Sequence, residues 1–126
     1  MPQSVLLPEN SVSIIRGTSK TFQWQVSDAQ GRFVDLTGAQ AFMTVKRIIE
    51  DPAPLIQKST RKTDQAVIST PRKGIVQFYF VPIDTQTLDP VEYIFDVWVI
   101  LASGARYAVV QPSVFQVEAG VTIIPP

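Results

Sequence analysis

The sequence has no cysteine and no histidine among its 126 residues. Without cysteine there are no disulfide bonds and no thiol nucleophiles, and zinc sites built on cysteine or histidine are also excluded. Without histidine there is no Ser-His-Asp triad and no general base of the usual kind near neutral pH. We therefore expect a protein that is not an enzyme and that holds no metal or cofactor.

Charge and long apolar runs are also scarce. Charged residues make up 17% of the chain, against roughly 25% in an average soluble domain. We therefore expect a surface that is rich in Ser, Thr and Gln and that is also partly covered by partners. The formal net charge is zero, so a nucleic-acid partner is not favoured. The longest apolar stretch, residues 93–102, is interrupted by Asp96 and is far shorter than the ~20 residues of a membrane span. Residues 1–10 lack the features of a signal peptide, so we expect a soluble protein without membrane contacts.

Short strand patterns separated by turn residues run along the whole chain. Phe22, Trp24 and Val26 alternate with polar residues, which predicts a strand with one buried face. The strongest strand pattern begins at Tyr93 and is apolar on both faces, so we expect a central strand or one whose outer face meets a partner. Patterns of this kind predict an all-β fold, a single antiparallel sandwich of about seven or eight strands.

The chain divides into one domain and two short ends. We predict a sandwich over residues 11–118, preceded by an N-terminal arm (1–10) and followed by a C-terminal tail (119–126). Within the last predicted strand, Pro112 is expected to break the pairing because proline has no backbone N–H to donate.

The aspartates are expected to serve local structure. Asp96 is the exception because it lies inside an apolar strand, where an unpaired carboxylate is costly. We expect it to lie on the outer face or to pair with a basic side chain, the candidates being Arg16, Lys46 and Arg106. Four others stand beside turn signals, where Asp accepts hydrogen bonds from neighbouring amides: Asp28, Asp35, Asp84 and Asp89.

Two further groups have alternative interpretations. Exposed Trp98 or Tyr107 could form a sugar-binding platform, although alternating aromatic residues are more often sandwich core. One group of basic residues is interpreted as a solvated loop, with a weak anion or nucleic-acid contact as the less favoured alternative: Lys58, Arg61, Lys62, Arg72 and Lys73.

Several short motifs, distributed over roughly residues 12–118, carry a family resemblance. The most specific is the turn formed by Asp35, Leu36, Thr37, Gly38 and Ala39. The others are Ile15-Arg16-Gly17, residues 22–28, Gly31, Val45-Lys46, Ile56-Gln57-Lys58, residues 74–80, Pro82 with Asp84-Thr85 and Leu88, residues 93–97, Gly104 and Phe115-Gln116-Val117. Together they resemble the immunoglobulin-like N-terminal domain of phage baseplate upper proteins and its small relatives in tailed phages.

The resemblance implies a structural role in a virus particle. It implies an immunoglobulin-like sandwich that is made in the bacterial cytoplasm and docks, in several copies, onto other virion proteins of the tail or baseplate. A capsid decoration or head-tail connector protein is the alternative, and a carbohydrate-binding module is a further one. The turn at Asp35 is expected to mark the fold, because Asp35 and Thr37 can bond the local backbone and Gly38 permits a left-handed conformation. The expected partner contacts are Val5, Leu6, Leu7, Trp98, Ile100, Val121, Ile123 and Ile124.

This sequence also departs from the family pattern. Relatives often carry Pro-Gly-Thr before the strand that begins at Tyr93, whereas this chain has Asp89-Pro90-Val91-Glu92. Many relatives also continue into a long shaft that this sequence does not contain. The resemblance therefore implies docking onto neighbouring proteins rather than direct binding of a host receptor.

Overall fold

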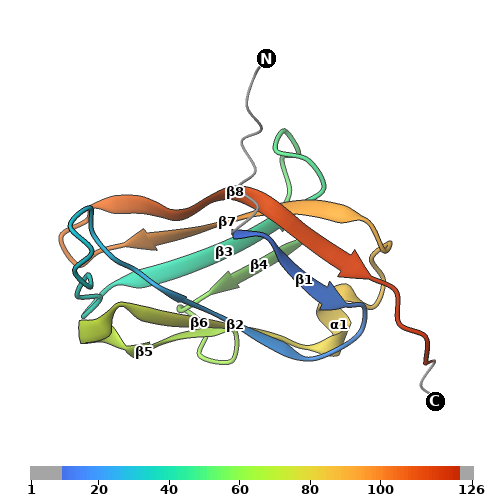
Figure 1. Cartoon of the computed structure of the whole chain (residues 1–126), viewed down its shortest axis with the longest axis horizontal. Coiled ribbons are helices and arrows are strands. Elements are labelled where there is room, and N and C mark those ends of the chain that lie inside the picture. The colour runs from blue at the N-terminus through green and yellow to red at the C-terminus, as the bar shows by residue number, and fades with distance from the viewer. Residues whose placement is uncertain (1–9, 123–126) are drawn as a thin grey trace.

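Two β-sheets packed face to face make up the computed structural model, which describes residues 10–122 (Figure 1). The larger sheet has five strands in the order β1-β8-β7-β3-β4. Its strands are β1 (Val12–Ile15), β3 (Gln40–Lys46), β4 (Ile56–Ser59), β7 (Glu92–Ile100) and β8 (Arg106–Glu118).

The smaller sheet has three strands in the order β2-β6-β5. Two single-turn helices join strands at the ends of the sandwich, and no helix within residues 10–122 approaches the apolar length that a bilayer crossing requires. The strands are β2 (Lys20–Gln25), β5 (Ala66–Thr70) and β6 (Ile75–Phe80), and the helical turns are η2 (Pro71–Lys73) and α1 (Pro82–Thr85).

The period-two alternation of apolar residues sets the inner faces, as the sequence predicts. Every second residue of β3, β6 and β7 is buried between the sheets, whereas Gln23 and Gln77 of the smaller sheet face outward and hydrogen-bond to each other. Fully buried side chains from both sheets form the core; among them are Ala41, Met43, Val45, Val76, Phe78, Val97 and Val99.

The prediction of an all-β sandwich of about eight strands is confirmed, and the strand order fits an immunoglobulin-like fold. In such folds the second, fourth and fifth strands share one sheet, whereas the third, sixth and seventh share the other. In this chain β4 is an additional strand at the edge of the larger sheet, so β5 to β8 correspond to the fourth to seventh strands of that pattern. Accordingly, β2, β5 and β6 form one sheet, and β3, β7 and β8 lie together in the other. The Tyr93 hydroxyl donates to the Asp89 carbonyl at 2.9 Å, as in the tyrosine corner of these domains.

One strand pair differs from the predicted antiparallel arrangement. β1 runs parallel to β8, with Val12 opposite Phe115 and Ile15 opposite Glu118 (Figure 1). Nearly the whole domain separates these two strands in the sequence, so no tight turn forces them to be antiparallel. A pairing between the first and last strands leaves no local signal in the sequence.

Pro112 lies inside β8 instead of ending a strand, which corrects the predicted break. Between Phe95 and Val97 the register of β7 with β8 shifts, so that Gln111 and Pro112 together face Asp96. A bulge of this kind leaves one residue outside the hydrogen-bond ladder, and a proline can occupy such a position because its missing N–H is not needed there.

Aromatic rings join the two sheets at the centre of the sandwich. The Phe115 ring of β8 lies 5.5 Å from that of Phe80 and 5.9 Å from that of Phe22, both on the smaller sheet. Beside them, Trp24 of β2 lies 5.8 Å from Phe95 of β7. Because these contacts cross from sheet to sheet, they hold the two layers at a fixed spacing without a disulfide bond.

A buried ion pair joins the edge of the larger sheet to the connection between the sheets. Lys58 Nζ of β4 lies 2.7 Å from Asp84 Oδ2 of α1, and both side chains are largely buried. Lys58 therefore does not belong to a solvated loop, which corrects that interpretation. Asp84 also accepts a hydrogen bond from the Val81 amide at 2.8 Å. It therefore stabilises the start of α1 from inside the helix, and its role extends beyond the local turn that the sequence suggested.

The ring contacts predict that Phe115→Ala lowers the free energy of unfolding by about 3–5 kcal/mol, because truncation leaves a cavity between the sheets. Equilibrium denaturation measures the loss. Phe33→Ala is the matched control, since the Phe33 side chain is 53% exposed and should change stability by less than about 0.5 kcal/mol. Similar losses in the two variants would contradict the assigned core.

The ion pair predicts that Lys58→Met lowers the free energy of unfolding by about 3 kcal/mol, because the Asp84 carboxylate then stays buried without its cation. Lys62→Met, on the exposed turn after β4, is the control. The double variant Lys58→Met/Asp84→Asn should lose clearly less stability than the sum of its single changes. Additive losses would show that the two side chains do not interact.

Candidate docking face

The outer faces of the two sheets differ in character. On the smaller sheet the outward positions of β2 and its neighbour β6 include Thr21, Gln23, Gln25 and Gln77, which suit contact with water. On the larger sheet the outward positions carry aromatic and aliphatic side chains beside three charged ones. We name this surface the docking face and define it by Phe42, Thr44, Lys46, Asp96, Trp98, Ile100 and Arg106.

Trp98 is the most prominent side chain of the docking face. It is 41% exposed and stands opposite Phe42 of β3 and Ala108 of β8. Its indole Nε1 donates to Asp96 Oδ2 at 2.9 Å, which satisfies the polar end of the ring and fixes its orientation. A large ring held in one orientation loses little conformational freedom when a partner covers it.

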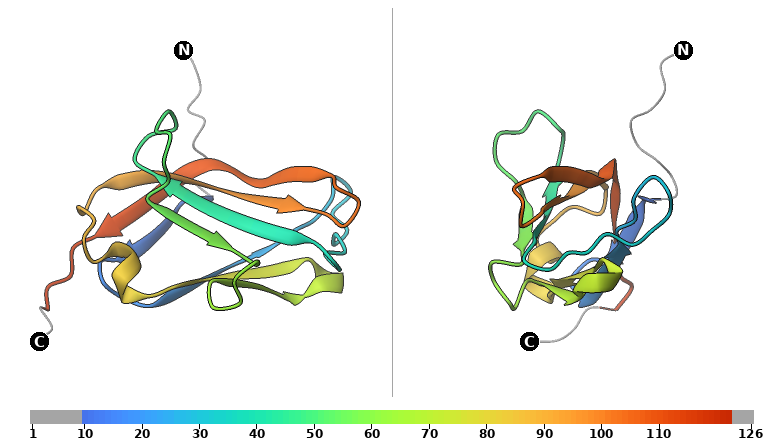
Figure 2. Two further views of the ribbon diagram at one scale, coloured as in Figure 1. Left: turned by 180° about the vertical axis from the view of Figure 1, so that it is seen from behind. Right: turned by 90° about the vertical axis from the view of Figure 1, so that its left-hand side faces the viewer.

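A loop between β3 and β4, residues 47–55, stands out from the larger sheet and forms a wall beside this face (Figure 2). Ile48, Ile49 and Leu55 on this loop are each about half exposed. Pro52 and Pro54 line a shallow hollow of about 460 Å³ that also contains Trp98. Sequence reasoning missed this wall, although apolar residues flanking a Pro-Ala-Pro motif were the available signal.

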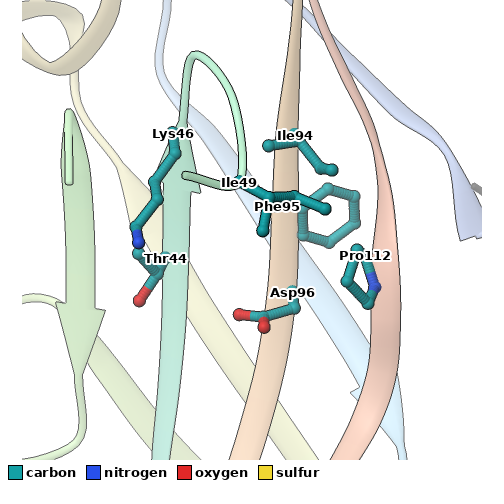
Figure 3. A pocket seen from close by; sticks show the side chains of 7 residues that line it. All are labelled: Thr44, Lys46, Ile49, Ile94, Phe95, Asp96 and Pro112. Atoms are coloured by element: carbon teal, nitrogen blue, oxygen red, sulfur yellow. The ribbon is translucent and has the colours of Figure 1, made fainter. Parts of the chain in front are cut away.

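A second, smaller hollow of about 90 Å³ adjoins the first (Figure 3). Ile49 reaches from the loop towards Ile94 and Phe95, while Pro112 of β8 closes the opposite side. Asp96, Thr44 and Lys46 line both hollows, so together these form one continuous depression across β3, β7 and β8. The depression is apolar at the loop and polar in its middle.

The charges of the docking face are unpaired with one another. Lys46 and Arg106 line the larger hollow together with Asp96, but the ion pairs found within residues 10–122 are Arg32–Asp28 and Lys58–Asp84. Asp96 therefore lies on the outer face, where it accepts a hydrogen bond from Trp98. It forms no ion pair with the predicted candidates Arg16, Lys46 and Arg106. Among the described residues, Lys46, Arg106 and Asp96 therefore have no ion-pair partner.

The turn predicted to mark the fold lies at one end of the sandwich, next to the strand ends at Gln40 and Ile100. Asp35 Oδ1 accepts hydrogen bonds from the Thr37 amide at 2.9 Å and the Thr37 hydroxyl at 2.6 Å. Leu36 is buried, and its amide donates to the Pro71 carbonyl at 2.8 Å. Gly38 has a φ of 75°, the left-handed value that glycine favours, and Ala39 donates to the Leu36 carbonyl. The turn thus closes one end of the core.

The aromatic residues proposed for a sugar platform do not gather on one surface. Trp98 belongs to the docking face, whereas Tyr107 stands opposite Val99, whose side chain points into the sandwich. Tyr107, 54% exposed, therefore borders the space between the sheets. Trp24 packs against the core. A carbohydrate-binding role would depend on Trp98 and its immediate neighbours.

The remaining predicted residues are spread over the molecule. Arg61 lies over the Phe42 ring and donates to Gln40 Oε1 at 3.0 Å, so the basic residues form no single patch. Val121 is fully exposed and Ile100 partly so. Within residues 10–122, no group of three or more acidic side chains gathers in a way that could hold a metal ion. Five of the expected partner contacts lie outside the described residues: Val5, Leu6, Leu7, Ile123 and Ile124.

Comparison of the chain with family models, curated proteins and solved structures finds no match in any of the three. The fold assignment consequently rests on the strand order and packing described above. The resemblance to phage baseplate domains stays a prediction from the sequence.

The Asp35 turn predicts a specific dependence of stability on pH. The hydrogen bonds from the Thr37 side chain and backbone lower the pKa of Asp35 below its ordinary value of 3.8. As the pH falls, the Asp35 carboxylate of the unfolded chain is therefore protonated before that of the folded chain. The contribution of Asp35 to folding stability is complete above about pH 4 and is lost as the pH falls through the lowered pKa of the folded state. Asp35→Asn replaces the titrating carboxyl with an amide. The variant should therefore lose less stability between about pH 5 and pH 2 than the wild type does.

Thermal unfolding across that range measures the difference. Thr37→Val provides a second comparison, because it removes the hydroxyl that bonds to Asp35 and should also reduce the acid sensitivity. If the stability of the wild type and of Asp35→Asn falls in parallel with decreasing pH, this turn does not contribute to the acid sensitivity.

Proposed function

We propose that this chain is a non-enzymatic structural or adaptor protein of a bacteriophage virion, located in the tail or baseplate, that docks onto other virion proteins. It works in several copies and is made in the cytoplasm of the host bacterium. The sequence resemblance supports the virion role, and the strand order is compatible with it. Since one fold serves many functions, the docking role needs support from a surface of this chain.

The exposed Trp98 on the docking face is the observation that carries the docking role. Interface centres are enriched in tryptophan, tyrosine and arginine and are poor in other charged residues. The docking face presents Trp98 and Arg106, and the loop at its side presents Ile48, Ile49 and Leu55, each about half exposed. Apolar side chains grouped in this way are typical of a surface that another protein covers.

Location within the particle is tested by mass spectrometry of purified phage separated into head and tail fractions. Peptides of this chain should accompany the tails. Peptides that accompany the heads would replace the proposal with a capsid decoration or head-tail connector protein. Absence from both fractions would remove the virion role and leave the fold alone.

Trp98→Ala should reduce incorporation of the protein into particles by at least about tenfold, because truncating an interface tryptophan commonly costs 2 kcal/mol or more. Quantitative mass spectrometry of particles grown with each variant measures the change, and thermal unfolding checks that the variant folds. Ile83→Ala is the matched control, since Ile83 is 69% exposed on α1, outside the docking face. Equal incorporation of both variants would show that docking uses a different surface.

A further inference from the structure

Most edges of this sandwich carry features that hinder pairing with another chain. Natural proteins protect a sheet edge by keeping the strand short, by bulges and prolines, or by a charged side chain that points inward. β4 has four residues and buries the charged Lys58. β5 has an irregular register between Ile68 and Thr70 and runs directly into Pro71. The part of β8 that β1 leaves uncovered is interrupted by the bulge at Pro112.

β1, which has four residues, is protected by hydrogen bonds to its backbone acceptors. The Ser13 carbonyl accepts a hydrogen bond from Lys20 Nζ at 2.6 Å, and the Ile15 carbonyl accepts one from the Thr18 amide at 3.2 Å. Both donors belong to the chain that leads from β1 into β2. A further strand would have to displace these donors before it could pair with β1.

β2, at the edge of the smaller sheet, has none of these features (Figure 1). It runs for six residues in regular register with β6, and residues 21–25 contain no charge and no proline. The Val26 amide donates to the Gly74 carbonyl at 2.8 Å, so by alternation the even-numbered residues of β2 bond to β6. Thr21, Gln23 and Gln25 therefore direct their backbone N–H and C=O groups towards the open edge. Within residues 10–122, no other strand pairs with β2 there.

We propose that β2 of one molecule pairs antiparallel with β2 of a second copy, about a two-fold axis at Gln23. The two smaller sheets then become one continuous sheet across the dimer. Gln23 faces Gln23 of the second copy, and Thr21 faces Gln25 of the second copy. Each of these pairs exchanges two backbone hydrogen bonds. A two-fold interface uses the same patch on both subunits, and the outward backbone groups of residues 21, 23 and 25 match themselves in this register.

A chain of side-chain hydrogen bonds leads towards this edge and ends at Gln23. The Tyr79 hydroxyl donates to Gln77 Oε1 at 3.3 Å, and Gln77 Nε2 donates to Gln23 Oε1 at 2.8 Å. Among the described residues, none accepts a hydrogen bond from Gln23 Nε2. In the dimer this nitrogen lies beside Gln23 of the second copy, whose carbonyl oxygen has a second lone pair to accept it. The row of amides then continues across the two-fold axis.

The inner side of β2 also suits a second copy. Phe22 and Trp24 point between the sheets, and Trp24 lines a groove of about 680 Å³ between β2 and β8. Pairing about Gln23 places Phe22 of one molecule opposite Trp24 of the other, and cross-strand aromatic pairs stabilise a sheet. Because residues 21–25 are uncharged, no like charges meet at the axis. This inference concerns a different surface from the docking face and does not depend on the proposed virion role.

Sedimentation of the purified full chain tests the pairing. The wild type should form dimers as its concentration rises. Gln23→Lys should weaken dimer formation by at least about tenfold, because like charges directly opposite each other destabilise a strand pair. Gln77→Lys is the matched control, since it adds the same charge to the same face one strand away from the edge and should dimerise like the wild type. Thermal unfolding checks that both variants fold.

A wild type that remains monomeric up to about 1 mM, where even weak interfaces associate, would overturn the proposal. Dimers that Gln23→Lys leaves intact but Trp98→Ala disrupts would also overturn it and would assign self-association to the docking face.

The absence of native cysteine allows a second test. Gln23→Cys should form a disulfide-linked dimer under mild oxidation, since facing residues of a hydrogen-bonded antiparallel pair have Cα atoms about 5.5 Å apart, within the range of the bond. Gln77→Cys is the control, because three strand spacings, roughly 14 Å, separate the two copies of that residue. Its yield should be at least about fivefold lower. Equal yields would contradict the pairing of β2 with itself.

Discussion

The contact of Phe115 with Phe22 and Phe80 is the constraint on which the rest of the sandwich depends. Immunoglobulin domains of antibodies fix their two sheets with a disulfide bond packed against tryptophan, and this chain has no cysteine. Rings from β2, β6, β7 and β8 take the place of that bond, with centroids 5.1 to 6.1 Å apart. Since Phe115 also lies opposite Val12 and Tyr93, the same side chain aligns three strands of the larger sheet.

The ends of the sandwich are closed by polar contacts rather than by further apolar packing. At one end Lys58 and Asp84 join an edge strand to α1, and Tyr93 donates to the Asp89 carbonyl. At the other end the Asp35 turn buries Leu36 and donates to Pro71. A buried ion pair contributes less to net stability than its short distance suggests, because both ions lose their hydration. Its value here is geometric, since it fixes where the chain crosses from one sheet to the other.

Periodicity predicted the local features of this fold and could not predict the pairings between distant segments. The alternation of Phe22, Trp24 and Val26 identified the buried face of β2 correctly, because a strand with one dry side records that side in its own residues. In β7 both faces are apolar, so its residues alone did not tell which face is buried. The parallel pairing of β1 with β8 and the burial of Lys58 depend on partners far away in the sequence. The same holds for the docking face. Its outward residues Trp98 and Ile100 could be predicted, because they make both faces of one strand apolar in the sequence. The position of the loop with Ile49 beside this face could be seen only in the folded structure.

β7 and β8 present different surfaces on their two sides, and the bulges in β8 make this compatible with one continuous sheet. At Asp96 the extra residue accommodates Pro112, which lines the outer depression, and nearer Trp98 a second shift turns Tyr107 towards the groove between the sheets. A regular strand of this length would keep one strict alternation. The irregular strand instead allows an outer face that carries Trp98 and a separate groove between the sheets that contains Tyr107.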